Sequence, residues 1–238
     1  MGEKPFKYIS GKVLYCHDDR GEVGRENFTI SKDNHGFRTL RARCEIDEDQ
    51  LLRDVVYTVD KNWLPIDAFV RLSVDGSFQG TTWYNFSDQM VECEAITRDA
   101  GRFTQQQRVD SWPMAFGAHP VANDAWGCAV FDMDNKEERQ HFKNCVTTSK
   151  TPHGNTGPNI TMTEKYISFH GNEELSVPAG IFETNYFQLS WDSNVVGYDW
   201  PPIHIWTYSD DFIIVKIRWD HLKSVSYTHL TLPTILLV

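Results

Sequence analysis

The sequence has little positive charge and no cluster of basic residues. Its 23 Lys and Arg residues are outnumbered by 33 Asp and Glu residues, and the formal net charge is −10 at pH 7. Proteins that bind nucleic acid neutralise its phosphates with a concentrated basic patch. We therefore expect no nucleic-acid partner.

Motifs for metals and organic cofactors are also missing. None of the 5 cysteines belongs to a C-x-x-C pair, and no H-x-H or H-E-x-x-H spacing occurs. The chain likewise lacks a serine nucleophile elbow, a phosphate-binding loop and the glycine pattern of dinucleotide-binding proteins. We expect no metal site and no cofactor. The odd number of cysteines favours a reducing compartment over a disulfide framework.

Long apolar runs are absent as well. No segment approaches the roughly 20 apolar residues of a membrane-spanning helix. The N-terminal stretch "MGEKPFKYISGKVLY" contains no uninterrupted apolar run of signal-peptide length. As written, the chain is predicted to be soluble and cytoplasmic, with no membrane span. A signal segment missing upstream would make the protein periplasmic, and the sequence indicates no particular oligomeric state.

What the sequence does contain is a repeated alternation of apolar and polar residues. In "RTLRARCEID", Leu40, Ala42 and Cys44 share one face, and charged residues occupy the other. Such alternation is typical of half-buried antiparallel strands, and helical periodicity is nearly absent. It also makes Cys44 and Cys93 small buried strand residues rather than nucleophiles. The aromatic content of 13% suits a sheet with an apolar interior.

Turn residues separate the alternating runs, so about eight strands are expected before Gln107. They lie near Tyr8–Cys16, Glu22–Ser31, Phe37–Ile46, Leu52–Asp60, Ile66–Val74, Phe78–Phe86, Met90–Thr97 and Arg102–Gln107. Short hairpins at this spacing indicate a meander that curls on itself. The predicted fold class is all-β: an antiparallel meander curled into a barrel or half-barrel.

The middle of the chain breaks the pattern. Residues 108–127 form one long irregular connection without a clear period, and we expect it to pack across an opening of the sheet. A short helix is predicted in "NKEERQHFKN" (135–144), after which strands resume. We expect one β-barrel-like domain over residues 1–224, with two lobes of about 1–107 and 128–224 as the alternative.

One stretch of the second half resembles a known family. "VPAGIFETNYFQLSW" (Val177–Trp191), followed by "IHIWTYSDDFIIVKIRW" (Ile203–Trp219), is similar to the uncharacterised bacterial β-proteins grouped as DUF3108-like, as is "GEVGRENFTI" near the start. The resemblance implies an all-β, lipoprotein-carrier-like sheet with no established activity. The residues themselves predict that Pro178 ends a strand, Gly180 permits the turn and Phe182 returns to the core.

The last residues of the chain have a different character. "VSYTHL" resembles one reading frame of the transposon end used to prepare DNA-sequencing libraries, with "TLPTILLV" as read-through. We therefore expect residues 225–238 to be non-native and the native chain to continue past Ser224 with a closing strand. A genuine docking tail is the alternative.

The candidate catalytic residues are His119 and Asp124 in "FGAHPVANDAWG". A histidine oriented by a carboxylate beside an aromatic wall can act as a general base near neutral pH. The plainer interpretation makes His119 a loop residue bonded to the backbone and Asp124 a turn or cap residue. A metal site formed by His119, His153 and a carboxylate has no supporting spacing.

A second set of residues is predicted to bind a ligand. Arg71 could meet an anionic head group while Trp83 or Tyr84 packs against an apolar body, provided that their strand faces line a cavity. The same candidate site includes Trp112, Trp126 and His153. The alternative is an exterior sheet face with cross-strand pairs of Arg41 and Arg43 against Glu92 and Glu94.

Three functions follow from these residues. The leading hypothesis is a module that binds a small amphipathic ligand, such as a lipid- or terpenoid-like compound. The second is a cofactor-independent hydratase, isomerase or hydrolase that uses His119 and Asp124, and the third is a structural or interaction protein. An aromatic-lined cavity containing His119 would favour the enzyme. A cavity without converging titratable groups would favour the binding module, and a filled core would favour neither of these two functions.

Overall fold

Residues 6–151, 153–192 and 201–219, together with the backbone of 224–231, are described by a computed structural model. The strands in these ranges are β1 (Phe6–His17), β2 (Gly21–Asp33), β3 (Arg38–Ile46), β4 (Leu51–Val59), β5 (Pro65–Val74), β6 (Ser77–Phe86), β7 (Met90–Thr97), β8 (Gly101–Arg108), β9 (Ala115–Gly117), β10 (Gln140–Thr147), β11 (Thr161–Val177), β12 (Gly180–Trp191), β13 (Ile203–Tyr208), β14 (Ile213–Trp219) and β15 (Ser224–Thr231). The helical segments are α1 (Val121–Trp126) and a single 3₁₀ turn, η1 (Met133–Asn135).

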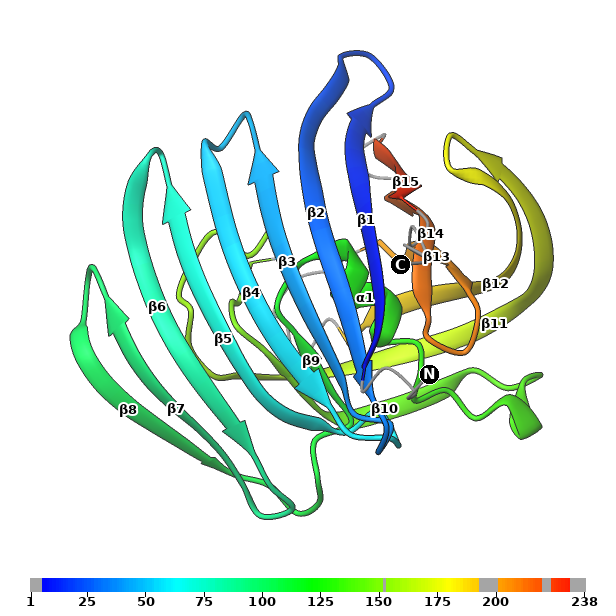
Figure 1. Cartoon of the computed structure of the whole chain (residues 1–238). Coiled ribbons are helices and arrows are strands. Elements are labelled where there is room, and N and C mark those ends of the chain that lie inside the picture. The colour runs from blue at the N-terminus through cyan, green and yellow to red at the C-terminus, as the bar shows by residue number, and fades with distance from the viewer. Residues whose placement is uncertain (1–5, 152, 193–200, 220–223, 232–238) are drawn as a thin grey trace.

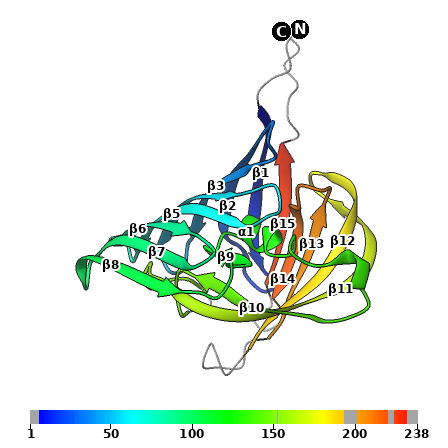
Figure 2. The same cartoon turned by 90° about the horizontal axis from the view of Figure 1, so that it is seen from below.

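The strands form one 15-stranded sheet in the order β8-β7-β6-β5-β4-β3-β2-β1-β15-β14-β13-β12-β11-β10-β9. All neighbouring strands are antiparallel except β9 and β10. The sheet curls on itself (Figure 1), and α1 lies inside the curl between its two halves (Figure 2). The predicted all-β fold class is confirmed, and each of the eight strands predicted before Gln107 is present.

Alternation explains why these segments are strands. Along β3, Leu40, Ala42 and Cys44 are buried, whereas Arg41 and Arg43 are exposed. One face of the strand therefore packs on the core and the other faces water, as an antiparallel sheet allows. The prediction that Cys44 and Cys93 are small buried strand residues is confirmed.

An aromatic cluster fills the first half of the curl. Tyr57 on β4 contacts Phe116 on β9 and Trp126 on α1, at ring-centroid distances of 5.4 and 5.8 Å. Trp63 packs edge-on against Trp126 at 5.5 Å. The long connection at 108–127 thus folds into β9 and α1, and both pack against the inner face of the sheet.

Two local predictions are wrong. Residues 135–144 do not form a helix, because β10 begins at Gln140 and pairs with β11. The burial of Phe142 in the core outweighs the local helix propensity of the charged residues before it. The cross-strand charge pairs do not form either: β4, β5 and β6 separate β3 from β7, and Arg43 bonds Glu45 instead.

The turn predicted in "VPAGIFET" is confirmed. Strand β11 ends at Val177 and β12 begins at Gly180, so Pro178 and Ala179 make a two-residue connection. Gly180 has a φ of 139°, which favours glycine. Phe182 is buried and packs with Val177. The hairpin therefore has the structure that its sequence indicates.

Strand β15 joins the two halves of the sheet. It pairs with β14 on one side and with β1 on the other. The position of the closing strand expected after Ser224 is therefore occupied by residues of the segment that resembles translated library sequence. Residues 232–238 of that segment lie outside the described residues.

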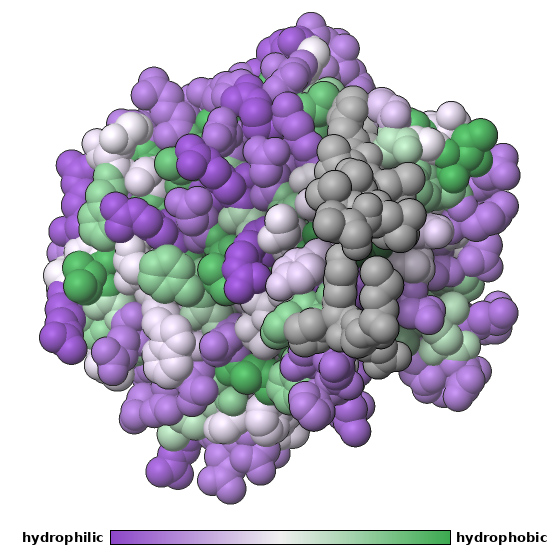
Figure 3. All heavy atoms as spheres, viewed as in Figure 1, coloured by the Kyte–Doolittle hydropathy of each residue, from purple (hydrophilic) through white to green (hydrophobic). Residues whose placement is uncertain are grey.

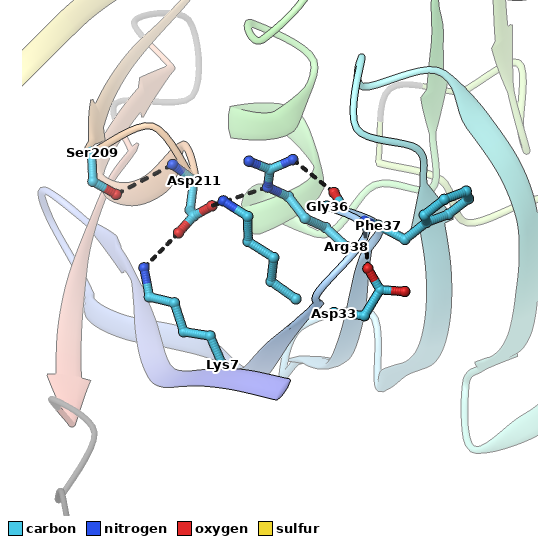
Figure 4. A network of polar contacts seen from close by, with 8 residues as sticks. Lys7, Asp33, Gly36, Phe37, Arg38, Ser209 and Asp211 are labelled. Carbon is cyan, nitrogen blue, oxygen red and sulfur yellow. Dashed lines mark hydrogen bonds and ion pairs between the residues drawn. The ribbon is translucent and has the colours of Figure 1, made fainter. Parts of the chain in front are cut away.

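A buried carboxylate ties the turn between β13 and β14 to the first strands of the chain (Figure 4). Asp211 accepts hydrogen bonds from Lys7 at 2.8 Å, from Lys32 at 3.0 Å and from Arg38 at 3.0 Å. Burial opposes ionisation of Asp211, but the hydrogen bonds from the three cations outweigh it and lower its pKa to about 2. The Arg38 guanidinium also lies 4.1 Å from the centroid of the Trp63 ring. We call these four charged residues the Asp211 network.

Candidate functional site

A cavity of about 560 Å³ lies inside the curl, between the two halves of the sheet and beside β9 and α1. Its wall combines cations, carboxylates, histidines and apolar side chains. Its polar lining residues include Arg20, Glu48, Asp49, Arg53, His119, Asp124, Thr147, Lys150, His153 and Lys165, and its apolar ones include Tyr15, Phe116, Val146, Leu189, Trp191, Ile203 and Trp219.

His119 immediately precedes the Pro120 cap of α1 and has a left-handed backbone, with φ at 74°. Its Nε2 lies 3.3 Å from the Thr147 hydroxyl. The loop containing Gly154 passes so close that a Cβ at this position would lie 2.5 Å from the His119 ring and 2.6 Å from Arg53 Nη2. Only glycine fits at this position, because any Cβ would clash with these two side chains. In addition, Gly154 has a φ of 64°, which other residues rarely adopt.

Glu26 holds the start of α1 in place from the neighbouring sheet. This fully buried carboxylate accepts hydrogen bonds from the backbone N–H groups of Val121 at 2.8 Å and Ala122 at 3.1 Å. It also accepts one from the Tyr15 hydroxyl at 2.6 Å. Burial raises the pKa of Glu26, and these hydrogen bonds oppose the shift. Since α1 begins just after His119 and carries Asp124, Glu26 positions both predicted catalytic residues.

Asp124 lies half-buried on the cavity side of α1. Burial and the nearby charge of Glu26 raise its pKa to about 7, although Lys165 and Arg53 act in the opposite direction. Its carboxyl group makes no hydrogen bond to His119 within the part of the chain that the structure describes. The cavity therefore holds a carboxyl group that changes charge near neutral pH, but no preformed His119–Asp124 pair.

Arg53 on β4 and Lys165 on β11 are two buried cations in the lining of this cavity. Arg53 is 1% exposed and donates from Nη2 to the carbonyl oxygens of His153 and Gly154, both at 2.8 Å. Lys165 is 6% exposed and donates to the Gly127 carbonyl at 3.2 Å. Among the described residues, neither cation has a carboxylate oxygen within 4.0 Å. Both charges are therefore held by neutral acceptors.

Apolar side chains and a set of exposed residues complete much of the lining, together with buried polar residues such as Asn123 and Ser149. Phe116, Val146, Leu189 and Ile203 are buried side chains of the interior. The exposed residues Arg20, Glu48, Lys150 and His153 mark the mouth, where Arg20 and Glu48 form an ion pair. The cavity lining consequently combines buried cations with apolar side chains.

The structure brings three of the sequence-predicted site residues to this cavity: His119, Asp124 and His153. Tyr84 and Trp126 are buried in the adjacent core, where the Tyr84 hydroxyl donates to the Asn159 carbonyl at 3.1 Å. Trp112 donates from its indole nitrogen to the Pro65 carbonyl at 2.7 Å. These three aromatic residues support the fold around the cavity without lining it.

Arg71 and Trp83 point to the opposite face of the sheet. Arg71 is exposed, bonds the Thr81 hydroxyl at 3.2 Å and lies 4.8 Å from the centroid of the Phe78 ring. Trp83 is 45% exposed. The outer face of β1–β8 is mostly hydrophilic, with scattered apolar residues (Figure 3). The sheet therefore separates both residues from the cavity.

Sequence reasoning missed Glu26, Arg53 and Lys165. Each lies on the buried face of its strand, where the neighbours two positions away are buried as well. A charged residue within an otherwise inward-facing set was the signal that could have found them, because such residues are costly to bury.

No group of three or more His, Cys, Asp or Glu side chains is arranged to hold a metal ion within the described ranges. Across the same residues, no helix has the length and apolar composition needed to cross a bilayer.

Comparison with known proteins supports the architecture. The fold is similar to the crystal structure of a β-barrel-like protein of a domain of unknown function, DUF1849, from Brucella abortus, with a TM-score of 0.54 and 10% sequence identity over 95% of each chain. No protein-family model and no curated protein matches the chain. At this identity the similarity shows the β-barrel-like fold alone.

Proposed function

We propose that this protein binds a small amphipathic molecule inside the half-barrel. The observation that carries the proposal is the cavity of about 560 Å³, whose lining contains two buried cations and several buried apolar side chains. Cavities of roughly 300–1,000 Å³ are typical of small-molecule sites, and a few polar groups in such sites orient the ligand. A structural protein with a filled core would have no need of this space.

Native mass spectrometry of the purified protein, with extraction and identification of bound lipids, tests this function directly. We expect a bound amphipathic compound, or a thermal stabilisation by members of a panel of fatty acids, alcohols and terpenoids, since binding to the folded state raises its stability. A protein that is empty and shows no shift with any member of the panel would contradict the proposal.

A catalytic function is the second candidate. The cavity meets the criterion given above for an enzyme, because it is lined by aromatic residues and contains His119. It ranks second because no hydrogen bond joins His119 to Asp124 among the described residues. Both residues line an aromatic-walled cavity, the backbone of His119 is left-handed, and Asp124 has a pKa of about 7. Backbone strain and pKa values near neutrality both cluster at functional sites. The reaction would be a cofactor-independent hydration, isomerisation or hydrolysis, with ligand binding as its first step.

The compound extracted from the protein provides the test of catalysis. It is incubated with the wild-type protein and with His119→Gln, and the products are analysed by mass spectrometry. Conversion by the wild type alone would support an enzyme. A compound that both proteins leave unchanged would leave binding as the function.

The family assignment and the origin of the chain end are proposals too. The confirmed hairpin at Val177–Gly180 supports the resemblance to DUF3108-like proteins. We further propose that residues 225–238 are translated library sequence. Recovering the same codons by resequencing without transposon tagging would contradict that origin.

A further inference from the structure

We infer that the ligand is an organic carboxylate whose charged end lies between Arg53 and Lys165, with its apolar body along Phe116, Leu189 and Ile203. This inference rests on the proposed binding function and adds the chemical class of the ligand. It starts from the charges that the cavity wall contains.

Burying a cation without a counter-charge is costly. Charged groups in protein interiors are ordinarily paired, because neutral hydrogen-bond acceptors replace only part of the lost hydration. Arg53 and Lys165 are both almost fully buried, and each is bonded to backbone carbonyl oxygens rather than to a carboxylate. A bound anion would supply the missing negative charge.

Both cations are held in place by close backbone approaches. A Cβ at Gly154 would lie 2.6 Å from Arg53 Nη2, and a Cβ at Gly127 would lie 2.9 Å from Lys165 Nζ. Glycine at these two positions lets the backbone carbonyls reach the cations. The charges are thus fixed in the wall, and binding an anion requires little reordering of their side chains.

Asp124 sets the charge that the ligand must carry. It is the carboxyl group whose ionisation responds to both Lys165 and Arg53. Glu26 is the second carboxyl group among these charges, and when only one of the two acids is ionised the two cations leave a single positive charge, which a monoanionic carboxylate compensates better than a phosphate dianion. When Asp124 is protonated, its hydroxyl becomes a donor for a carboxylate oxygen.

The apolar residues of the cavity lining indicate the chemical nature of the rest of the ligand. Phe116, Leu189 and Ile203 are each at most 3% exposed, and their side chains offer a ligand no polar group. Burial of a hydrocarbon chain against them is favourable in proportion to the apolar area that it removes from water. A hydrocarbon chain attached to a carboxylate therefore matches both the cations and the apolar residues of the cavity lining.

Titrations of the delipidated full chain with dodecanoate, dodecanol and dodecyl phosphate test this inference. Fluorescence of the lining residues Trp191 and Trp219 provides the readout. We expect dodecanoate to bind at least about tenfold more tightly than dodecanol, since hydrogen bonds between charged groups are stronger than those to a neutral hydroxyl. Lys165→Met should lower the affinity for dodecanoate about tenfold and leave the affinity for dodecanol unchanged.

The matched control is Arg71→Met, which removes a cation from the outer face of β5. It should leave all three affinities unchanged. Arg53→Lys is the second cavity variant because it keeps the charge, and it should retain more dodecanoate affinity than Arg53→Met. Circular dichroism confirms that each variant is folded.

The outcomes separate the two proposals. Equal binding of dodecanoate and dodecanol, unaffected by Lys165→Met, would overturn the carboxylate site and leave amphipathic binding intact. Tighter binding of dodecyl phosphate than of dodecanoate would overturn the inference that the site prefers a monoanion. A loss of dodecanoate affinity in Arg71→Met as large as in Lys165→Met would place the site on the outer face. If none of the three compounds binds, both proposals fail.

Discussion

Two regions of this molecule bury charged side chains, and they do so in opposite ways. In the Asp211 network, one carboxylate receives hydrogen bonds from three cations on β1, β2 and β3. In the cavity wall, Arg53 and Lys165 are bonded to backbone carbonyls, and Asp124 is the acid whose ionisation responds to both. In the Asp211 network the buried charges contact a charge of opposite sign, whereas Arg53 and Lys165 in the cavity lining do not. Removing one member of a buried ion pair destabilises the fold, whereas buried charges that line a cavity without such a contact are candidates for a binding site.

Removing the carboxylate of the Asp211 network should have the largest effect. Asp211→Asn leaves buried Arg38 without its ion-pair partner, and we expect a loss of about 3 kcal/mol in the free energy of unfolding, measured by urea denaturation. The control is Glu94→Gln, whose exposed contact with Arg102 should contribute at most about 0.5 kcal/mol. Equal effects of the two substitutions would show that the network is not a stabilising feature.

The same network predicts an acid dependence. The pKa of Asp211 in the folded protein is about 2, below its value of 3.8 in the unfolded chain, so ionised Asp211 favours folding above about pH 4. This contribution, roughly 2 kcal/mol, should disappear as the pH falls from about 4 to 2. The stability difference between wild type and Asp211→Asn should therefore narrow over that interval. A difference independent of pH would assign the effect of the substitution to packing.

Gly154 offers a way to sharpen the description of the cavity. Gly154→Ala should destabilise the protein by about 1.5 kcal/mol more than Gly101→Ala, since both residues have a positive φ but only Gly154 would bring a Cβ against His119 and Arg53. Comparing the two variants by thermal unfolding removes the contribution of backbone strain, which both substitutions share, from the difference in stability. The methyl group added at position 154 should also weaken dodecanoate binding, and unchanged binding would separate the loop from the site.

Asp124 should produce an effect on stability that increases with pH. Its pKa of about 7 in the folded state lies above the unfolded value of 3.8, so the folded state loses stability as the pH rises from about 4 to 7. Asp124→Asn should therefore raise the stability at pH 8 by about 2 kcal/mol more than at pH 5. Thermal melts at the two pH values measure this difference, and equal effects at both would contradict the raised pKa.

Ligand affinity should follow the same titration. The charges that act on Asp124 are Glu26 on β2, Arg53 on β4 and Lys165 on β11. Ionised Asp124 repels a carboxylate, so the affinity for dodecanoate should fall as the pH rises through about 7. In Asp124→Asn this dependence should be lost, while dodecanol binding should be independent of pH in both proteins.

Much of the fold could be predicted because strand signals are local. The alternation around Leu40 and Cys44 identifies β3 and its buried face, and Gly180 marks the hairpin between β11 and β12. The helix predicted at 135–144 is wrong because pairing with β11 decides the structure of that segment. Gln140, for example, pairs with Ile167, far along the chain. Pairing across such distances is not visible in a short window.

The candidate site was predicted only in part. His119 and Asp124 share one irregular segment, so their proximity was readable from the chain. Arg71 and Trp83 were assigned to a cavity from the polar face of their strands, but α1 and β9 pack against the other face. Alternation shows that a strand has two different faces, and only the packing of other elements decides which of them encloses a cavity.

The sequence by itself determined the strands, their turns and the side chains that share each face, because these depend on residues two positions apart. It also contained the inward-facing charges at Glu26, Arg53 and Lys165. Only the tertiary structure decided that Arg53 on β4, Asp124 on α1 and Lys165 on β11 meet around one cavity. Their meeting depends on the curl of a 15-stranded sheet, in which long-range pairing brings distant segments together.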